Sequence, residues 1–199
     1  MTKLGAATLT VPEAAYVAGV TERVVNHEID AHILRSHGRK SERAVSGADV
    51  LYLGAVRDIR KHIAPKLRKQ MREAITSAVT AAKPVAKVAA LEVEIAAVEQ
   101  RMIENFKALE RMKRDYIESR PGVLAGEPVI RGTRIAARLV ADLIKQGMSR
   151  DEIRHEYDLT AEQIEAALIF DRVTPKRGRP RVRKIHVKTH SSRSLPTVA

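Results

Sequence analysis

PGVLAGEPVIRGTRI, residues 121–135, decides the fold of the C-terminal half of this chain. Glycines and prolines flank a short apolar run there, and helical periodicity begins directly after it. Gly132 permits a positive φ angle, Thr133 is a suitable cap for the next helix, and Arg131 and Arg134 can tie the segment to its domain. The same two arginines also suit bidentate binding of a carboxylate or phosphate on a partner. Both interpretations stay open at this stage.

Three short helices are expected after this segment. The first covers residues 136–146 and ends at Gly147, the type of residue that commonly closes a helix. The other two begin at Ser149 and Thr160, and each cap is followed three residues later by Glu or Gln, the pattern of a capping box. Their spacing predicts that one side is buried through Ile153, Tyr157, Ile164, Ala167 and Leu168. Residues 121–171 are therefore predicted to form a compact helical domain.

The Gly-Pro-rich segment and the capped helices together resemble the trihelical domain of unknown function 433 (DUF433). This family occurs in antitoxins of VapBC-like toxin–antitoxin pairs. One departure is the run Ala125-Gly126-Glu127, where the family more often has paired glycines before its proline. The resemblance implies a VapB-like antitoxin of a type II pair, which neutralises a PIN-like ribonuclease toxin and represses its own operon. The alternative is a stand-alone DNA-binding transcriptional regulator, or a nucleoid-type protein, without a toxin.

The N-terminal residues 1–56 are predicted to form a DNA-binding domain. Thr10 begins one short helix, Gly19 interrupts it and Thr21 caps a second helix, the layout of a helix-turn-helix. A basic hairpin around residues 38–40 follows as a candidate wing, and the whole resembles the winged helix-turn-helix of the MerR and excisionase class. The expected DNA contacts are Thr21, Arg23, Asn26, His27, Arg39, Lys40 and Arg43. The alternative is a capped helical hairpin whose charges are only solvated.

Residues 57–120 are predicted to form a helical linker or dimerisation segment. The pattern is helical up to about residue 82, with an interruption at Pro65, and helical again from Val98 to Tyr116. Residues 85–93 alternate ambiguously, and a short strand is favoured there over the start of the next helix. The spacing of the second helical stretch suits a bundle or a dimer seam. The predicted fold class is thus mainly α, with a possible short dimerising strand.

Residues 172–199 are predicted to form a flexible basic tail. They hold nine basic residues and no acidic one, so the other 27 basic and 24 acidic residues contribute only +3 of the formal charge of +12. A polyanion or an acidic pocket is the expected partner. The resemblance implies that the tail inserts into the acidic metal site of the toxin. A Gly-Arg-Pro core in the tail would instead suit an A·T-rich minor groove of DNA. The third interpretation is a tail that only keeps the protein in solution. The candidate contacts are Lys176, Arg177, Arg179, Arg181, Arg183 and Lys184.

The composition of the chain narrows the classes of function and of binding site that are expected. The chain has no cysteine, which excludes disulfides and fits a reducing cytosol, and it has no apolar run long enough to cross a membrane, so a cytoplasmic protein is expected. No phosphate loop, nucleophile with a placed base or metal-ligand cluster is evident, so neither an enzyme, a cofactor nor a metal is expected. The expected partners are operator DNA, the toxin and a second copy of the chain, in a homodimer or a larger hetero-oligomer.

Overall fold

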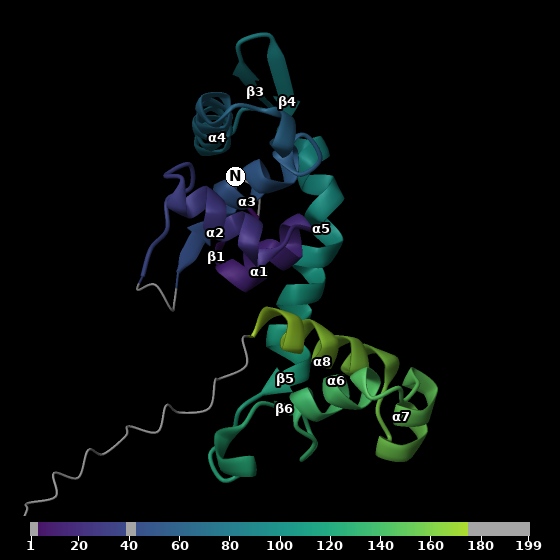
Figure 1. Cartoon of the computed structure of the whole chain (residues 1–199). Coiled ribbons are helices and arrows are strands. Elements are labelled where there is room, and N and C mark those ends of the chain that lie inside the picture. Colours follow the sequence, from purple (N-terminus) through teal and green to yellow (C-terminus); the bar gives the residue numbers. More distant parts are fainter. Residues whose placement is uncertain (1–3, 39–42, 175–199) are drawn as a thin grey trace, which may run out of the picture.

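The computed structural model describes residues 4–38 and 43–174 and shows a mainly helical chain with small antiparallel strand pairs. One long helix, α5, runs along the N-terminal part and leads into the C-terminal part (Figure 1). The elements of the N-terminal part are β1 (Thr8–Thr10), α1 (Val11–Ala18), α2 (Glu22–Asp30), β2 (Ala44–Ser46), α3 (Gly47–Val56), η2 (Arg60–His62), α4 (Pro65–Thr80), β3 (Val85–Val88), β4 (Leu91–Glu94) and α5 (Ile95–Arg111).

The first two helices follow the capping signals in the sequence. The Glu13 carboxylate accepts a hydrogen bond from the backbone N–H of Thr10 at 3.0 Å, so α1 begins where predicted. α1 ends at Gly19, whose φ of +67° is in the left-handed region that glycine tolerates. The Thr21 hydroxyl then accepts from the N–H of Val24 and caps α2. The two helices pack against each other, and α1 also packs on α3, while Val25 and Ile29 of α2 are buried.

A short strand pair closes the N-terminal part. β1 and β2 pair antiparallel, with Leu9 opposite Val45. An extended arm follows α2, and it is joined to β2 by an isolated bridge in which His37 and Ala44 exchange two backbone hydrogen bonds of 2.9 and 3.0 Å. Because the candidate wing residues Arg39 and Lys40 lie outside the described residues, the structure supplies only the two sides of that hairpin.

The stretch predicted as one strand, residues 85–93, is instead a hairpin of β3 and β4. The chain reverses at Ala89, which has a φ of +51°, so no glycine or asparagine marks the turn in the sequence. Ala86 and Val88 of β3 are buried, and β3 packs on α4. α4 and α5 in turn pack on α3, so residues 57–111 complete the core of the N-terminal part.

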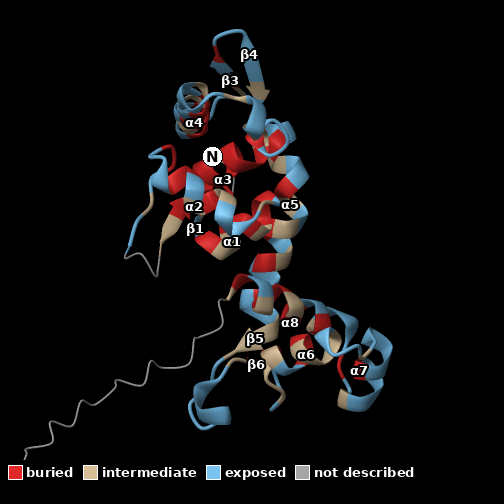
Figure 2. Ribbon diagram, in the orientation of Figure 1, coloured by how far each residue is buried: buried red, intermediate tan, exposed pale blue. Residues whose placement is uncertain are grey.

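α5 packs tightly against α3 through a glycine. A Cβ atom built on Gly54 would lie 2.4 Å from the Sδ atom of Met102, closer than nonbonded atoms approach. Met102, Phe106 and Leu109 of α5 are buried. Figure 2 shows buried residues, in red, at intervals along this helix. The helical stretch predicted as a bundle or dimer seam is therefore packed within the chain over this side.

The C-terminal part opens with a strand pair. A π-helical turn, η3 (Met112–Tyr116), leads into β5 (Ile117–Glu118), which pairs antiparallel with β6 (Val129–Ile130). The helices α6 (Ala137–Lys145), α7 (Arg150–Tyr157) and α8 (Ala161–Val173) follow, after the short turn η4 (Leu124–Gly126). The capping boxes predicted at Ser149 and Thr160 are present.

Two predicted details of this part are wrong. Thr133 does not cap α6, because the cap position belongs to Ala136 and the Thr133 hydroxyl instead accepts from the N–H of Ile135 at 3.0 Å. The helical periodicity also does not stop at Arg172, since α8 continues to Val173, which is 5% exposed.

The two parts meet where the end of α8 lies against α1. The Arg172 guanidinium sits over the Tyr16 ring, 5.1 Å from its centroid, and Lys113 pairs with Glu13 at 2.8 Å. Burial beside Glu165 raises the pKa of Tyr16, although the Arg172 charge opposes that shift. The first helix of the helix-turn-helix pattern therefore contacts both the end of α5 and the last helix of the C-terminal part.

Candidate nucleic-acid interface

The predicted contact residues of α2 lie mostly on one exposed face. Thr21, Arg23 and His27 are exposed, as the sequence predicts. Asn26 is half-buried, and its Nδ2 donates to the backbone oxygen of Glu22 at 3.1 Å, so its amide is directed along the helix. Arg43 on the return side of the hairpin pairs with Asp30 at 3.0 Å, which ties that side to the end of α2.

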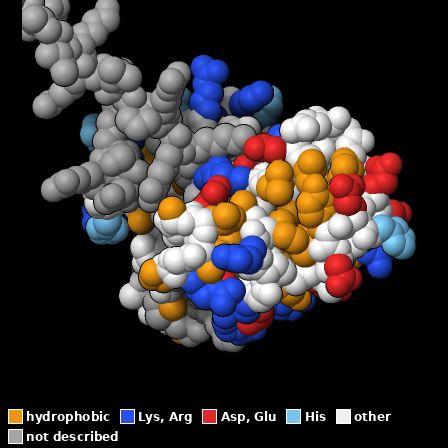
Figure 3. Space-filling model, turned by 90° about the horizontal axis from the view of Figure 1, so that it is seen from below, with side chains coloured by type: hydrophobic (Ala, Val, Ile, Leu, Met, Phe, Trp, Pro, Cys, Tyr) orange, Lys and Arg blue, Asp and Glu red, His pale blue; other side chains and the backbone are white. Residues whose placement is uncertain are grey.

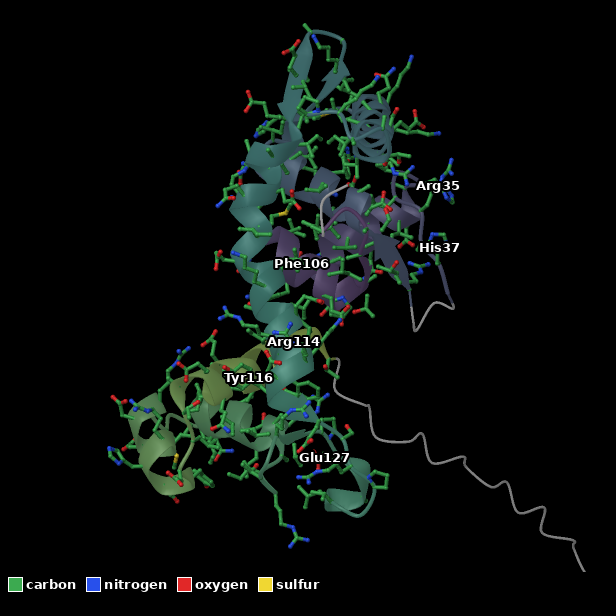
Figure 4. All side chains as sticks on the ribbon, turned by 180° about the vertical axis from the view of Figure 1, so that it is seen from behind. Arg35, His37, Phe106, Arg114, Tyr116 and Glu127 are labelled. Atoms are coloured by element: carbon green, nitrogen blue, oxygen red, sulfur yellow. The ribbon has the colours of Figure 1, made fainter. Side chains whose placement is uncertain are left out.

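The arm after α2 adds an exposed arginine and an exposed histidine that were not among the predicted contacts. Arg35 and His37 are exposed, while Ile33 and Leu34 are buried. Figure 4 shows Arg35 and His37 together at the edge of the N-terminal part that lies opposite α5. Their spacing of two residues is the period of an extended chain, so the alternation was the signal that could have found them. A groove lined by Asp30, Arg35, His37 and Arg43 separates this arm from the end of α2.

A buried ionic cluster lies directly under the exposed face of α2. Glu28 is fully buried, and its carboxylate accepts from the Tyr52 hydroxyl at 2.9 Å, from Arg60 Nε at 2.7 Å and from Arg68 Nη1. Burial and the negative charge of Glu28 raise the pKa of Tyr52 above its ordinary range, so its hydroxyl remains a donor. Arg60 also reaches His27, with its Nη2 2.9 Å from the imidazole Nδ1. This cluster joins α2 to α3, η2 and α4.

A second buried pair fixes the start of α3. The Asp49 carboxylate accepts from the Ser46 hydroxyl at 2.8 Å and from Arg72 Nε at 2.7 Å. Asp49 is 1% exposed and Arg72 is 8% exposed. A buried charge is tolerated when it is paired and hydrogen-bonded, and this one holds α4 against the capped end of α3.

In the Arg-Gly-Thr-Arg run after β6, Arg131 and Gly132 form hydrogen bonds with residues that lie close before it in the chain. Arg131 donates through Nη2 to the backbone oxygen of Arg114 at 2.9 Å and lies 3.6 Å from a Glu118 oxygen. The other Glu118 oxygen accepts from the N–H of Gly132 at 3.1 Å, and Gly132 has a φ of +78°. These contacts support the structural reading for Arg131. Arg134 is exposed, and within residues 4–38 and 43–174 it has no recorded ion pair, so it stays available to a partner.

Other site types receive no support within the described ranges. No group of three or more metal-ligating side chains lies together there. No helix in the same ranges combines the length and the apolar character needed to span a bilayer. The predicted tail contacts, Lys176, Arg177, Arg179, Arg181, Arg183 and Lys184, lie outside the residues that the structure describes.

Comparisons with known proteins give one family, one relative and one solved structure. A family described as a protein of unknown function (DUF433) matches residues 117–170. The uncharacterized protein y4eO of Sinorhizobium fredii is 39% identical over 70 residues, which is 35% of this chain and 32% of that protein. The chain thus matches about a third of the length of this curated relative. The crystal structure of Rv2018 from Mycobacterium tuberculosis is 15% identical with a TM-score of 0.33, over 80% of this chain and 96% of that one.

The start of the family match agrees with the strand pairing. The match begins at Ile117, where β5 opens the C-terminal part and pairs with β6. It ends at Phe170, within α8. The Gly-Pro-rich segment and the capped helices of the sequence analysis fall inside these limits. Residues 117–170 of this chain are a DUF433 domain.

Proposed function

We propose that the chain binds double-stranded DNA through α2 and the arm that follows it, as a winged helix-turn-helix regulator. The observation that supports this most directly is the exposed face of α2, which carries Arg23 and His27, followed by an arm that exposes Arg35 and His37. A second helix of such a motif lies in the major groove, with its N-terminal residues at the base edges. The arm and the hairpin would then lie along the neighbouring phosphates.

The charge of this face suits the proposal. Arg23 and Arg35 are exposed, and no recorded ion pair of the described residues involves them. The N-terminus of α2, which Thr21 caps, also carries the positive end of the helix dipole. Each Lys or Arg that neutralises a phosphate adds about −0.9 to the slope of log affinity against log salt.

Binding to the DNA upstream of the chain's own coding sequence tests this proposal. Fluorescence anisotropy with that duplex over a salt series would measure both affinity and slope. Arg23→Ala should weaken binding about tenfold or more. Arg101→Ala is the matched control, because Arg101 is also an exposed arginine but lies on α5, on the opposite side. Equal effects of the two substitutions, or no binding that depends on sequence, would contradict the assignment.

We further propose that the chain is a VapB-like antitoxin that represses its own operon and neutralises a PIN-like ribonuclease. Two features support this part: the DUF433 domain, which resembles that of such antitoxins, and the basic sequence after residue 174. Figure 3 shows apolar side chains gathered on the underside of the molecule, and Leu139 of α6 is 43% exposed. Exposed apolar surface rimmed by charges is common at protein–protein interfaces. The alternative remains a stand-alone regulator, which would bind DNA without a ribonuclease partner.

An inhibition assay distinguishes the antitoxin from the stand-alone regulator. It uses a PIN-domain ribonuclease that is encoded beside this chain and co-purified with it. The full chain should inhibit RNA cleavage, and a chain that ends at Thr174 should inhibit it at least tenfold less. Leu139→Asp should weaken complex formation, whereas Leu91→Asp, at an equally exposed leucine on β4, should not. DNA binding without any ribonuclease complex would favour the stand-alone regulator.

A further inference from the structure

His27 is held from behind by an arginine that comes from another element. The imidazole is on the exposed face of α2, and 59% of the side chain is accessible. Its Nδ1 is 2.9 Å from Nη2 of Arg60 in η2, 33 residues further along the chain. The Glu28 carboxylate is also near Nδ1, but at 3.6 Å it is beyond hydrogen-bond distance. The contact with Arg60 therefore decides whether Nδ1 of His27 donates or accepts a hydrogen bond.

The contact leaves the ring nitrogen only one role. A guanidinium carries five N–H donors, has no acceptor and does not lose its proton in proteins. Nδ1 must therefore accept the hydrogen bond from Arg60, and the neutral ring carries its proton on Nε2. In a neutral histidine, the hydrogen bond made by one ring nitrogen determines which of the two nitrogens carries the proton. The exposed ring of His27 thus offers a hydrogen-bond donor, not an acceptor.

Arg60 is itself held in place by the buried cluster. Its Nε donates to Glu28 at 2.7 Å, and its side chain is 16% exposed. Glu28 is held in turn by Tyr52 at 2.9 Å and by Arg68. The cluster therefore fixes both the position and the tautomer of His27.

We infer that Arg60 is a positioning residue for base recognition, which holds His27 as an Nε2–H donor to a base edge in the major groove. This inference rests on the proposed DNA-binding function and specifies what its recognition helix reads. Major-groove acceptors are purine N7, guanine O6 and thymine O4, whereas cytosine N4 and adenine N6 present donors. A fixed donor selects the first group at one base pair and disfavours a cytosine or adenine amino group there.

Two experiments test the inference. The first is nitrogen-15 NMR of the histidine rings in the full chain without DNA. The wild-type chain should show His27 with a pyridine-type Nδ1 and a protonated Nε2, and Arg60→Lys should shift the ring toward a mixture of tautomers. A protonated Nδ1 in the wild-type chain would overturn the inference whatever the chain binds.

The second experiment is selection of duplexes from a random library by the wild-type chain, His27→Leu, Arg60→Lys and the control Arg101→Lys. Lysine at position 60 keeps a positive charge beside Glu28, so the fold should persist, as circular dichroism would verify. Both test variants should lose preference at the same single base pair, roughly five- to tenfold, while the control keeps it. Where that base is a purine, its 7-deaza analogue should weaken the wild-type chain by a similar factor and leave His27→Leu unaffected.

The outcomes separate the two proposals. A motif that His27→Leu retains in full, or one that only His27→Leu and not Arg60→Lys relaxes, would overturn the role of Arg60. Failure of the wild-type chain to enrich any motif would instead refute sequence-specific DNA binding, and the inference with it.

Discussion

Glu28→Gln should destabilise the N-terminal part far more than an ordinary surface substitution. The Glu28 side chain is fully buried and is the acceptor shared by Tyr52, Arg60 and Arg68. Glutamine keeps the volume but removes the charge, and its amide group places donors against the two guanidiniums. Loss of one partner from a buried ionic group costs about 3 to 5 kcal/mol, because the remaining charge stays uncompensated.

Urea unfolding followed by far-ultraviolet circular dichroism measures this cost. With a slope of about 2 kcal/mol per molar urea, a loss of about 4 kcal/mol lowers the midpoint by about 2 M. Tyr52→Phe removes one hydrogen bond to a charged group and should cost less, about 1.5 to 3 kcal/mol. Glu22→Gln is the control on the same helix, since Glu22 is exposed in the first turn and its contribution through the helix dipole is at most about 1 kcal/mol.

The reasoning fails if Glu28→Gln and Glu22→Gln unfold at the same urea concentration. That result would mean that water reaches the two guanidiniums well enough to replace the carboxylate. Hydrogen exchange of the α2 and α3 amides provides an independent reading, because the cluster joins these two helices and its loss should raise their exchange first.

Three further predictions follow from single contacts. Because the pKa of Tyr52 is raised in the folded chain, its stabilising contribution is present below the unfolded value of 10.0 and declines above it; the free energy of unfolding should therefore fall as the pH rises above about 10, and Tyr52→Phe should flatten this decline. Ser149→Ala removes the cap of α7 and should cost about 1 kcal/mol in thermal unfolding, while Ser77→Ala, exposed within α4, should not destabilise the chain. Gly132→Ala meets no atom within 4 Å but must adopt a φ of +78°, so about 1 to 2 kcal/mol of backbone strain should lower the melting temperature, and an unchanged value would refute that reading of the turn.

Local signals in the sequence predicted most of the helices because caps and turns act over three or four residues. Glu13, Ser149 and Thr160 each bond within one helical turn, and Gly19 closes α1 without help from elsewhere. Local signals did not predict the turn of the β3–β4 hairpin, because Ala89 adopts a left-handed conformation that an alanine side chain does not favour. Packing on α4, not the turn residue, supports that reversal.

Local signals in the sequence also could not predict the buried ionic cluster around Glu28, for a different reason. Glu28 lies between the buried positions Val25 and Ile29 of α2, so helical spacing alone directs it inward. Spacing does not say which cations will meet it. Arg60 and Arg68 arrive from 32 and 40 residues away, and they do so only because α4 packs on α3. The candidate interface was therefore predicted as a row of exposed side chains, while the residues that position it were missed.

The junction between the two parts gives the proposed activities a physical means of influencing each other. α1 packs on α2, carries Glu13 and Tyr16, and through them contacts Lys113 and Arg172 of the elements that lead into and end the DUF433 domain. A partner that shifts α8 would alter a helix that supports α2, the proposed recognition helix. If such a partner changes DNA affinity by some factor, DNA must change affinity for the partner by the same factor. Tyr16→Leu removes the ring under Arg172, so it should reduce this mutual factor in both directions while leaving each separate affinity nearly unchanged.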